Sequence, residues 1–390
     1  MYSKTLLTVI ICSLLVFNSR AQVTEATAEA DLHSLNLYNA AQWKELMVYG
    51  KEKISAGTDF PLLRMRTGYA SFMLGNFGQS LLQYKKVLDA EPDNGIALYY
   101  VYLNNLYLNN ITAARFYAGK LPDETKLAEK ITKIKLSAVD GEFSFKIPSD
   151  TFRKNAQYYR VGFNVQLGYR LELQQSVAFY NQIINEPRLS PIINNRQRID
   201  IREKQYYGKL IFAASGKVSI LGGFHYIYTP FNNLAYNNTI VFAGIKYASS
   251  FVHVKVMANF GNITDTSYNQ YDATVSLFPL GNTKLYSITR AAYGNDFTLS
   301  QILGYGITKN IWLEGNVTLG KFNNLLENDA LYVFNDIDQK QFKAGASVYA
   351  AVSKKLLVTV NYTFEQKLKY STLNNKFYQH SLNGGLSWKF

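Results

Sequence analysis

The second half of the chain alternates apolar and polar residues with a period of two, in runs of 9 to 13 residues. One run reads FVHVKVMANF from Phe251, and another reads LLVTVNYTFEQK from Leu356. The runs end at turn signals such as Lys309-Asn310. Because successive side chains of a strand point to opposite faces, each run predicts a β-strand with one apolar and one polar face. Residues 141–390 are therefore predicted to form a large antiparallel sheet.

The length of these runs favours a transmembrane barrel over a soluble sandwich, in which alternation also occurs. Strands of soluble proteins average about 5 to 6 residues, whereas tilted membrane strands need about 9 to 11. Tyrosine and phenylalanine also crowd the strand ends, as aromatic girdles at the two lipid interfaces require. The girdles are predicted to comprise Tyr158, Tyr159, Tyr206, Tyr207, Tyr226, Tyr228, Phe231, Tyr236, Tyr247, Tyr268 and Tyr271.

The last strand carries the most specific signal in the chain. The stretch HSLNGGLSWKF places Leu386, Trp388 and Phe390 on one face and ends on the aromatic residue. It resembles the terminal strand of outer-membrane barrels, which ends in a C-terminal phenylalanine. The resemblance implies that the barrel-assembly machinery reads this strand and that the strand closes the barrel against the first one.

Counting strands back from Phe390 predicts 14 strands, with the first at residues 142–147. The count falls to 12 if residues 158–184 form one continuous bent strand. Both numbers are even, so both ends of the barrel are expected on the same side of the membrane. The long connections at residues 187–203 and 323–340 are expected on the opposite, extracellular side.

The first 21 residues are predicted to be a secretory signal peptide. Lys4 precedes an apolar run, and Ser19-Arg20-Ala21 supplies a cleavage site after Ala21. The run is too short to span a bilayer, and the only cysteine, Cys12, leaves with it unless that residue carries a lipid anchor. No later segment has 18 consecutive apolar residues, and only helices and closed barrels can span lipid. The predicted location is the outer membrane of a Gram-negative-type cell.

Residues 22–140 show a helical period instead and are predicted to form a periplasmic helical domain, which makes the whole chain an α+β multidomain protein. Trp43, Phe77 and Ile111 each follow a short break and are spaced by 34 residues. The middle unit resembles a tetratricopeptide repeat, in which small residues let two antiparallel helices approach and a proline ends the unit. The matching residues are Gly68, Gly75, Phe77, Ser80, Tyr84 and Pro92. The flanking units match less well, so an irregular helical bundle is the alternative.

The chain carries no motif for catalysis, cofactor binding or a metal centre. Its four histidines do not share a metal-ligand spacing, and no nucleophile or phosphate-binding motif occurs. The enzymatic alternative is a serine–histidine pair on barrel strands, His253 with Ser276. The polar side chains predicted to face the lumen are His253, Lys255, Glu314 and Glu365. Charges inside a barrel either pair and plug it or line a water channel, and the sequence leaves both arrangements open.

The formal net charge of +13 fits nucleic acid or an anionic membrane surface, but no nucleic-acid motif accompanies it. The expected partners are therefore outer-membrane lipid and lipopolysaccharide. The phosphates of lipopolysaccharide would suit the basic loop at residues 187–203, although a solvated loop explains these charges equally well.

A periplasmic repeat domain ahead of an outer-membrane barrel is similar to the YaiO-type family of outer-membrane proteins and, more loosely, to the repeat-plus-barrel proteins of exopolysaccharide export. The resemblance implies a non-enzymatic barrel whose repeats recruit an unknown periplasmic protein, as a scaffold for envelope assembly, secretion or surface-polymer export. The alternatives are a pore for solutes and an outer-membrane enzyme that modifies lipid or glycan.

Overall fold

The computed structural model describes residues 25–186, 197–231, 234–370 and 375–390. The predicted signal peptide and Cys12 lie outside the described residues. The chain folds as two compact units, one ending at Tyr100 and the other beginning at Val101.

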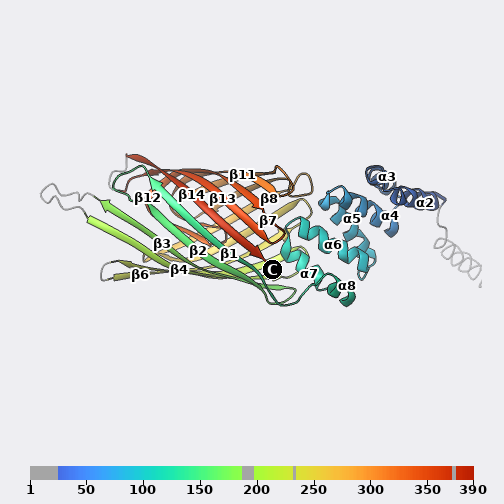
Figure 1. Ribbon diagram of the computed structural model, residues 1–390, viewed down its shortest axis with the longest axis horizontal. Coiled ribbons are helices and arrows are strands. Elements are labelled where there is room, and N and C mark those ends of the chain that lie inside the picture. Colours follow the sequence, from blue (N-terminus) through green and yellow to red (C-terminus); the bar gives the residue numbers. More distant parts are fainter. Residues whose placement is uncertain (1–24, 187–196, 232–233, 371–374) are drawn as a thin grey trace, which may run out of the picture. The chain divides into compact units, whose positions relative to one another are not determined.

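The described residues contain seven helices, followed by strands only (Figure 1). The helices are α2 (Glu25–Asn39), α3 (Trp43–Ser55), α4 (Pro61–Met73), α5 (Phe77–Ala90), α6 (Gly95–Tyr107), α7 (Ile111–Ala118) and α8 (Asp123–Ala128). Helices α3, α5 and α7 begin at Trp43, Phe77 and Ile111, the positions that the 34-residue spacing marks. No helix of the described residues is long and apolar enough to cross a membrane.

The first unit packs its helices through small residues and rings. A Cβ atom built on Gly68 would lie 2.9 Å from Cε2 of Tyr84, so glycine is what lets α4 approach α5 here. The Tyr84 ring is buried and stacks on Tyr100 at 4.7 Å. Burial raises the pKa of Tyr84 and raises the pKa of Tyr100 to about 12, so both rings stay neutral at physiological pH. Ser80 is also buried, Gly75 ends α4 with a φ of 73°, and Pro92 is exposed after α5.

Fourteen antiparallel strands close into a barrel in which β1 pairs with β14, so the predicted count of 14 is confirmed (Figure 1). The strands are β1 (Lys135–Pro148), β2 (Ala156–Gln166), β3 (Leu171–Glu186), β4 (Gln197–Ala213), β5 (Val218–Phe231), β6 (Leu234–Ala248), β7 (Val252–Ile263), β8 (Thr266–Leu277), β9 (Leu285–Tyr293), β10 (Phe297–Gly306), β11 (Ile311–Glu327), β12 (Tyr332–Ala351), β13 (Leu356–Leu368) and β14 (Lys376–Lys389). We call the rim where β1 begins and β14 ends the near rim, and the opposite one the far rim.

The outer face of the strands is mainly apolar. On β6, Val241 is 54% exposed while its neighbour Phe242, which points into the lumen, is 2% exposed. At the end of the chain, Leu386 and Trp388 of β14 are exposed on the outer face, and Phe390, which follows the strand, is exposed as well. A closed barrel has no unpaired edge, and an apolar outer band is what lipid requires. The barrel is therefore a transmembrane one.

Two details of the barrel differ from the sequence prediction. Strand β1 begins at Lys135, upstream of the predicted residues 142–147, because a bulge between Leu136 and Ala138 disrupts the alternation on which that prediction rests. Three of the predicted girdle tyrosines, Tyr158, Tyr207 and Tyr268, lie inside the barrel. In a pair such as Tyr158-Tyr159, adjacent residues must face opposite sides, so only one of the two can meet lipid.

At the near rim, helices α7 and α8 of the second unit contact the connection between β2 and β3 and its flanking residues. Arg115 of α7 forms an ion pair with Glu172. Lys126 of α8 lies 5.6 Å above the Tyr169 ring. These contacts attach the last helices to the wall of the barrel.

An arginine at the middle of the lipid-facing surface should destabilise the folded barrel. Val241 lies at the centre of β6, so Val241→Arg is expected to lower the free energy of unfolding by about 2 to 4 kcal/mol. Tyr247→Arg, near the end of the same strand, should cost only about 0 to 1 kcal/mol. Urea titration in lipid vesicles, with the folded fraction read from gel mobility, measures both free energies of unfolding. Equal losses for the two variants would contradict a lipid-facing surface.

Candidate functional site

The connection between β11 and β12 folds into the lumen instead of standing outside. Residues 324–335 form a short antiparallel hairpin of their own, with Asn324 opposite Asn335 and Glu327 opposite Tyr332. We call this segment the lumen hairpin. It was expected within the extracellular loop at residues 323–340, and that expectation is wrong for the hairpin itself. Its backbone contacts polar side chains of the inner wall, which a solvated loop would not need.

Gln270 of β8 holds one strand of the lumen hairpin by its backbone. Its Nε2 donates to the Leu326 carbonyl at 2.9 Å, and its Oε1 accepts from the Leu326 N–H at 2.9 Å. Arg290 donates to the same carbonyl, and Tyr268 donates to the carbonyl of Asn324 at 3.1 Å. A buried backbone group without a partner is costly, and these side chains supply the partners that a neighbouring strand would otherwise provide.

The tip of the lumen hairpin is held by charge. Asp329 forms ion pairs with Lys209, at 3.1 Å, and with Lys255. Beside it, Tyr207 donates to the Asp329 carbonyl at 3.1 Å, and Nδ1 of His225 donates to the Ala330 carbonyl at 2.7 Å. Both lysines lie in the near-rim halves of their strands, so the tip reaches deep into the barrel.

On one side, the lumen hairpin packs against apolar residues that point inward. Leu326 and Ala330 belong to a buried cluster with residues of β4 to β8, which comprises Tyr207, Ile211, Leu221, Ile240, Phe242, Met257, Ile263 and Tyr268. Inward-facing apolar residues would be exposed to water in an open pore. Their presence on this half of the wall shows why the hairpin folds inward.

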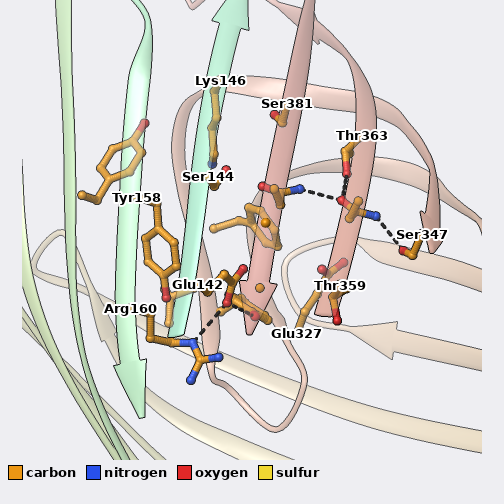
Figure 2. Close-up of a pocket in the computed structure, with 18 of the residues that line it drawn as sticks. Glu142, Ser144, Lys146, Tyr158, Arg160, Glu327, Ser347, Thr359, Thr363 and Ser381 are labelled. Carbon is orange, nitrogen blue, oxygen red and sulfur yellow. Dashed lines mark hydrogen bonds and ion pairs between the residues drawn. The ribbon is translucent and has the colours of Figure 1, made fainter. Parts of the chain in front are cut away.

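On the other side, the lumen hairpin borders a polar cavity of about 460 Å³. The cavity extends along the wall from Asp140 and Ser387, near the near rim, to Lys146 and Glu365. Figure 2 shows residues of β1 and β2 (Glu142, Ser144, Lys146, Tyr158, Arg160) on one wall and hydroxyl groups of Ser347, Thr359, Thr363 and Ser381 on another. Tyr332 of the hairpin donates to Glu142 Oε2 at 2.6 Å, so the hairpin contacts this wall as well.

A layer of paired charges closes the cavity toward the far rim. Lys340 is fully buried, 2.7 Å from Asp336 and 3.2 Å from Glu365, and its Nζ lies 3.7 Å from the centre of the Phe334 ring. Lys367 contacts the same two carboxylates at 3.3 and 3.4 Å. A separate small cavity of about 20 Å³, lined by Arg153, Asp336 and Lys367 among others, lies beyond this layer. Within the described part of the chain, the paired charges therefore separate the polar cavity from the far rim.

A second charge cluster lies in the far-rim loops. Arg153, which is 3% exposed, donates to both carboxylate oxygens of Asp338 at 2.7 and 2.6 Å and to Asp150 at 2.8 Å. Lys369 donates to Asp150 at 2.9 Å. Burial alone would raise the pKa of Asp150, but Lys369 and Arg153 outweigh it and hold the pKa below its ordinary value. The stability from this carboxylate is present above about pH 4 and is lost as the pH falls further.

The four polar residues predicted to face the lumen all lie on its inner wall. Lys255 binds the hairpin tip, and Glu365 belongs to the sealing layer. Glu314 accepts from Tyr349 at 2.9 Å and from Tyr286. The ring of His253 lies 4.8 Å from that of Phe278. In the described part of the chain, no group of three or more His, Asp or Glu side chains is placed to hold a metal ion.

The sequence analysis missed the lumen hairpin, although one signal marks it. The stretch LLENDALYVF places apolar residues on both sides of a turn, in a segment expected to be an exposed loop. An extracellular loop has no reason to carry that many apolar residues. Asn328, Asp329 and Ala330 all have a positive φ, which makes the tight turn at the tip.

Removing the centre of the far-rim cluster should destabilise the barrel strongly. Arg153→Met leaves two buried carboxylates with only Lys369 between them, and is expected to lower the free energy of unfolding by about 3 to 5 kcal/mol. Arg202→Met breaks an exposed pair with Asp200 and should cost about 0 to 1 kcal/mol. Urea unfolding in detergent micelles compares the two. A loss at Arg153 as small as that at Arg202 would show that the cluster adds nothing.

No family model and no curated protein matches the chain. Among solved structures, the P. putida toluene transporter TodX is 7% identical, with a TM-score of 0.45 over 74% of this chain and 94% of that one. A Pseudomonas aeruginosa FadL homologue is 10% identical, with a TM-score of 0.45 over the same shares. The Acinetobacter baumannii outer membrane protein Omp33 is 7% identical, with a TM-score of 0.40 over 65% and 99%. Likeness at this level carries no argument about substrate.

Proposed function

We propose that the protein is a gated outer-membrane channel for small polar solutes, with the lumen hairpin as its gate. The observation that carries the proposal is the division of the lumen. The hairpin fills the apolar half, and the polar half remains a cavity of about 460 Å³ that is closed at one end. A protein that needed only a filled barrel would have no use for this cavity.

The contacts of the lumen hairpin suit a gate better than a permanent plug. Among the described residues, no strand of the wall forms a backbone ladder with the lumen hairpin; side chains such as Lys209, Lys255 and Gln270 hold it instead. Exchanging such contacts for water requires no change in the strand pairing of the barrel. The hairpin can therefore leave while the wall stays intact, which is the arrangement that a two-state element requires.

The scaffold function implied by the architecture rests on the helical domain alone. The polar cavity of the barrel supports a channel function, whereas no feature of the described barrel residues supports a scaffold function. We keep the recruitment of a periplasmic protein as a proposal for the helices, where it accompanies a channel function and does not replace it. We propose that the near rim and the helices face the periplasm; the even strand count supports only that β1 begins and β14 ends at the same rim.

Conductance across a planar bilayer tests the gate. The wild-type protein is expected to be closed for most of the recording, because the lumen hairpin fills one half of the lumen and the layer of paired charges separates the other half from the far rim. Asp329→Asn removes the charge that two lysines bind and should cost the closed state about 1 to 3 kcal/mol, which raises the ratio of open to closed time about 5- to 150-fold. Replacing residues 324–336 by Gly-Ser-Gly removes the hairpin together with Asp336, a carboxylate of the layer of paired charges, and should give a steadily open channel.

Asp296→Asn is the matched control, because Asp296 is exposed in the turn between β9 and β10 and, among the described residues, no hydrogen bond or ion pair joins its carboxylate to the lumen hairpin. It should leave the recording unchanged. A heat-dependent shift in gel mobility identifies the variants that have folded. If folded protein without the hairpin stays silent, or if Asp329→Asn behaves as Asp296→Asn does, the lumen hairpin is not a gate and the proposal fails.

A further inference from the structure

The cavity beside the lumen hairpin has charged side chains at both of its ends. At the near-rim end, one guanidinium serves two carboxylates. Arg160 lies 2.5 Å from Asp140 and 3.1 Å from Glu142, and both carboxylates are partly accessible. One unit of negative charge is therefore left over, which favours a cationic group at this end.

At the opposite end, Lys146 supplies a positive charge. Its Nζ lies 5.3 Å from the centre of the Tyr180 ring, and no carboxylate of the described residues is within ion-pair distance of it. Glu203, which lines the same end, accepts a hydrogen bond from Gln205 instead. The neighbouring lysines, Lys340 and Lys367, are already paired with Asp336 and Glu365. The ammonium of Lys146 is thus free to bind an anionic group.

Two hydroxyl groups beside these charges have no hydrogen-bond partner among the described residues. Ser144 Oγ is one of them, on a residue that is only 3% exposed, and Tyr158 OH is the other. Ser144 lies opposite Tyr158 in the register of β1 and β2, and Figure 2 shows Lys146 extending along the wall toward Ser144. A buried hydroxyl without a hydrogen-bond partner destabilises the fold, and a ligand that accepts its hydrogen would remove this cost.

The distance between the charged ends limits the length of the ligand. Glu142 and Lys146 are four residues apart on β1, which separates their Cα atoms by about 13 Å, and the direction of Lys146 shortens the gap between the charges. An extended peptide of two or three residues spans about 7 to 10 Å. A cavity of about 460 Å³ lies within the usual range for a small-ligand site.

The remaining wall offers partners for peptide groups. Asn361 uses its amide on Ser347 and accepts from Thr363 and Asn383, so its capacity is filled. These hydrogen bonds hold Asn383 and Ser347 in place. They leave the side-chain oxygen of Asn383 as an acceptor and the hydroxyl hydrogen of Ser347 as a donor for a ligand. Amide and hydroxyl groups in fixed positions are what a peptide backbone requires.

We propose that this cavity binds a zwitterionic peptide of two or three residues, with its carboxylate at Lys146 and Ser144 and its ammonium at Asp140 and Glu142. The inference deepens the proposed function, because the peptide would be the solute that the channel admits.

Titration calorimetry on the full chain in detergent micelles tests the site with three probes: trialanine, N-acetyl-trialanine and trialanine amide. The wild-type protein should bind trialanine at least tenfold more tightly than either capped probe. Lys146→Met should bind trialanine and its amide equally while still rejecting the acetylated probe. Asp140→Asn should bind trialanine and N-acetyl-trialanine equally while still rejecting trialanine amide. Lys217→Met, in an exposed turn, is the control and should match the wild type.

The inference is overturned if wild-type protein does not bind trialanine, if it binds the three probes equally, or if Lys146→Met keeps its preference for trialanine over the amide. The heat-dependent gel shift identifies folded variants. Binding is measured without opening the gate, so this result and the conductance result are independent. A conducting barrel without peptide binding overturns the ligand alone, and peptide binding in a barrel that never conducts overturns the channel alone.

Discussion

Lipid offers no hydrogen-bonding partner to a peptide group, so a sheet that crosses a membrane must pair its first strand with its last. Here β1 and β14 pair from Ala138 opposite Lys389 to Pro148 opposite Gln379. Because β1 and β14 pair antiparallel, the start of β1 and the end of β14 lie at the same rim. Closure also creates an interior that the side chains must either fill or leave to water. The division of the lumen into a filled half and a polar cavity follows from that requirement.

The two halves of the interior differ because different strands supply them. Strands β4 to β8 point apolar side chains inward, where Phe242 and Ile240 meet Leu326. Strands β12 to β14 and β1 to β3 supply hydroxyl, amide and charged groups instead. A hairpin with one apolar face can cover only the first kind of wall. Its other face, with Glu327 and Tyr332, is polar and completes the cavity.

Much of the barrel was predictable from the sequence because strand alternation is a local property. The number of strands, the outward face of β14 and the inward direction of Lys255 and Glu365 all follow from counting by two. The position of the lumen hairpin was not predictable in this way, because Asp329 contacts Lys209 and Lys255, which are far away along the chain. Nor could the cavity be foreseen, since Asn383 meets Ser144 only when β14 closes against β1. Local periodicity also cannot tell which tyrosine of a pair such as Tyr206-Tyr207 faces lipid.

The lumen hairpin also bears on how the barrel folds. Its partners are remote in the chain: Tyr207 is 122 residues from Asp329, and Glu142 is 190 residues from Tyr332. Contacts of such long range form late, because much chain entropy must be lost before they contribute. The hairpin cannot contact both walls until the sheet has curled, so no wall covers its apolar residues before the barrel closes. A chaperone that shields this short stretch would protect the barrel at its most aggregation-prone stage.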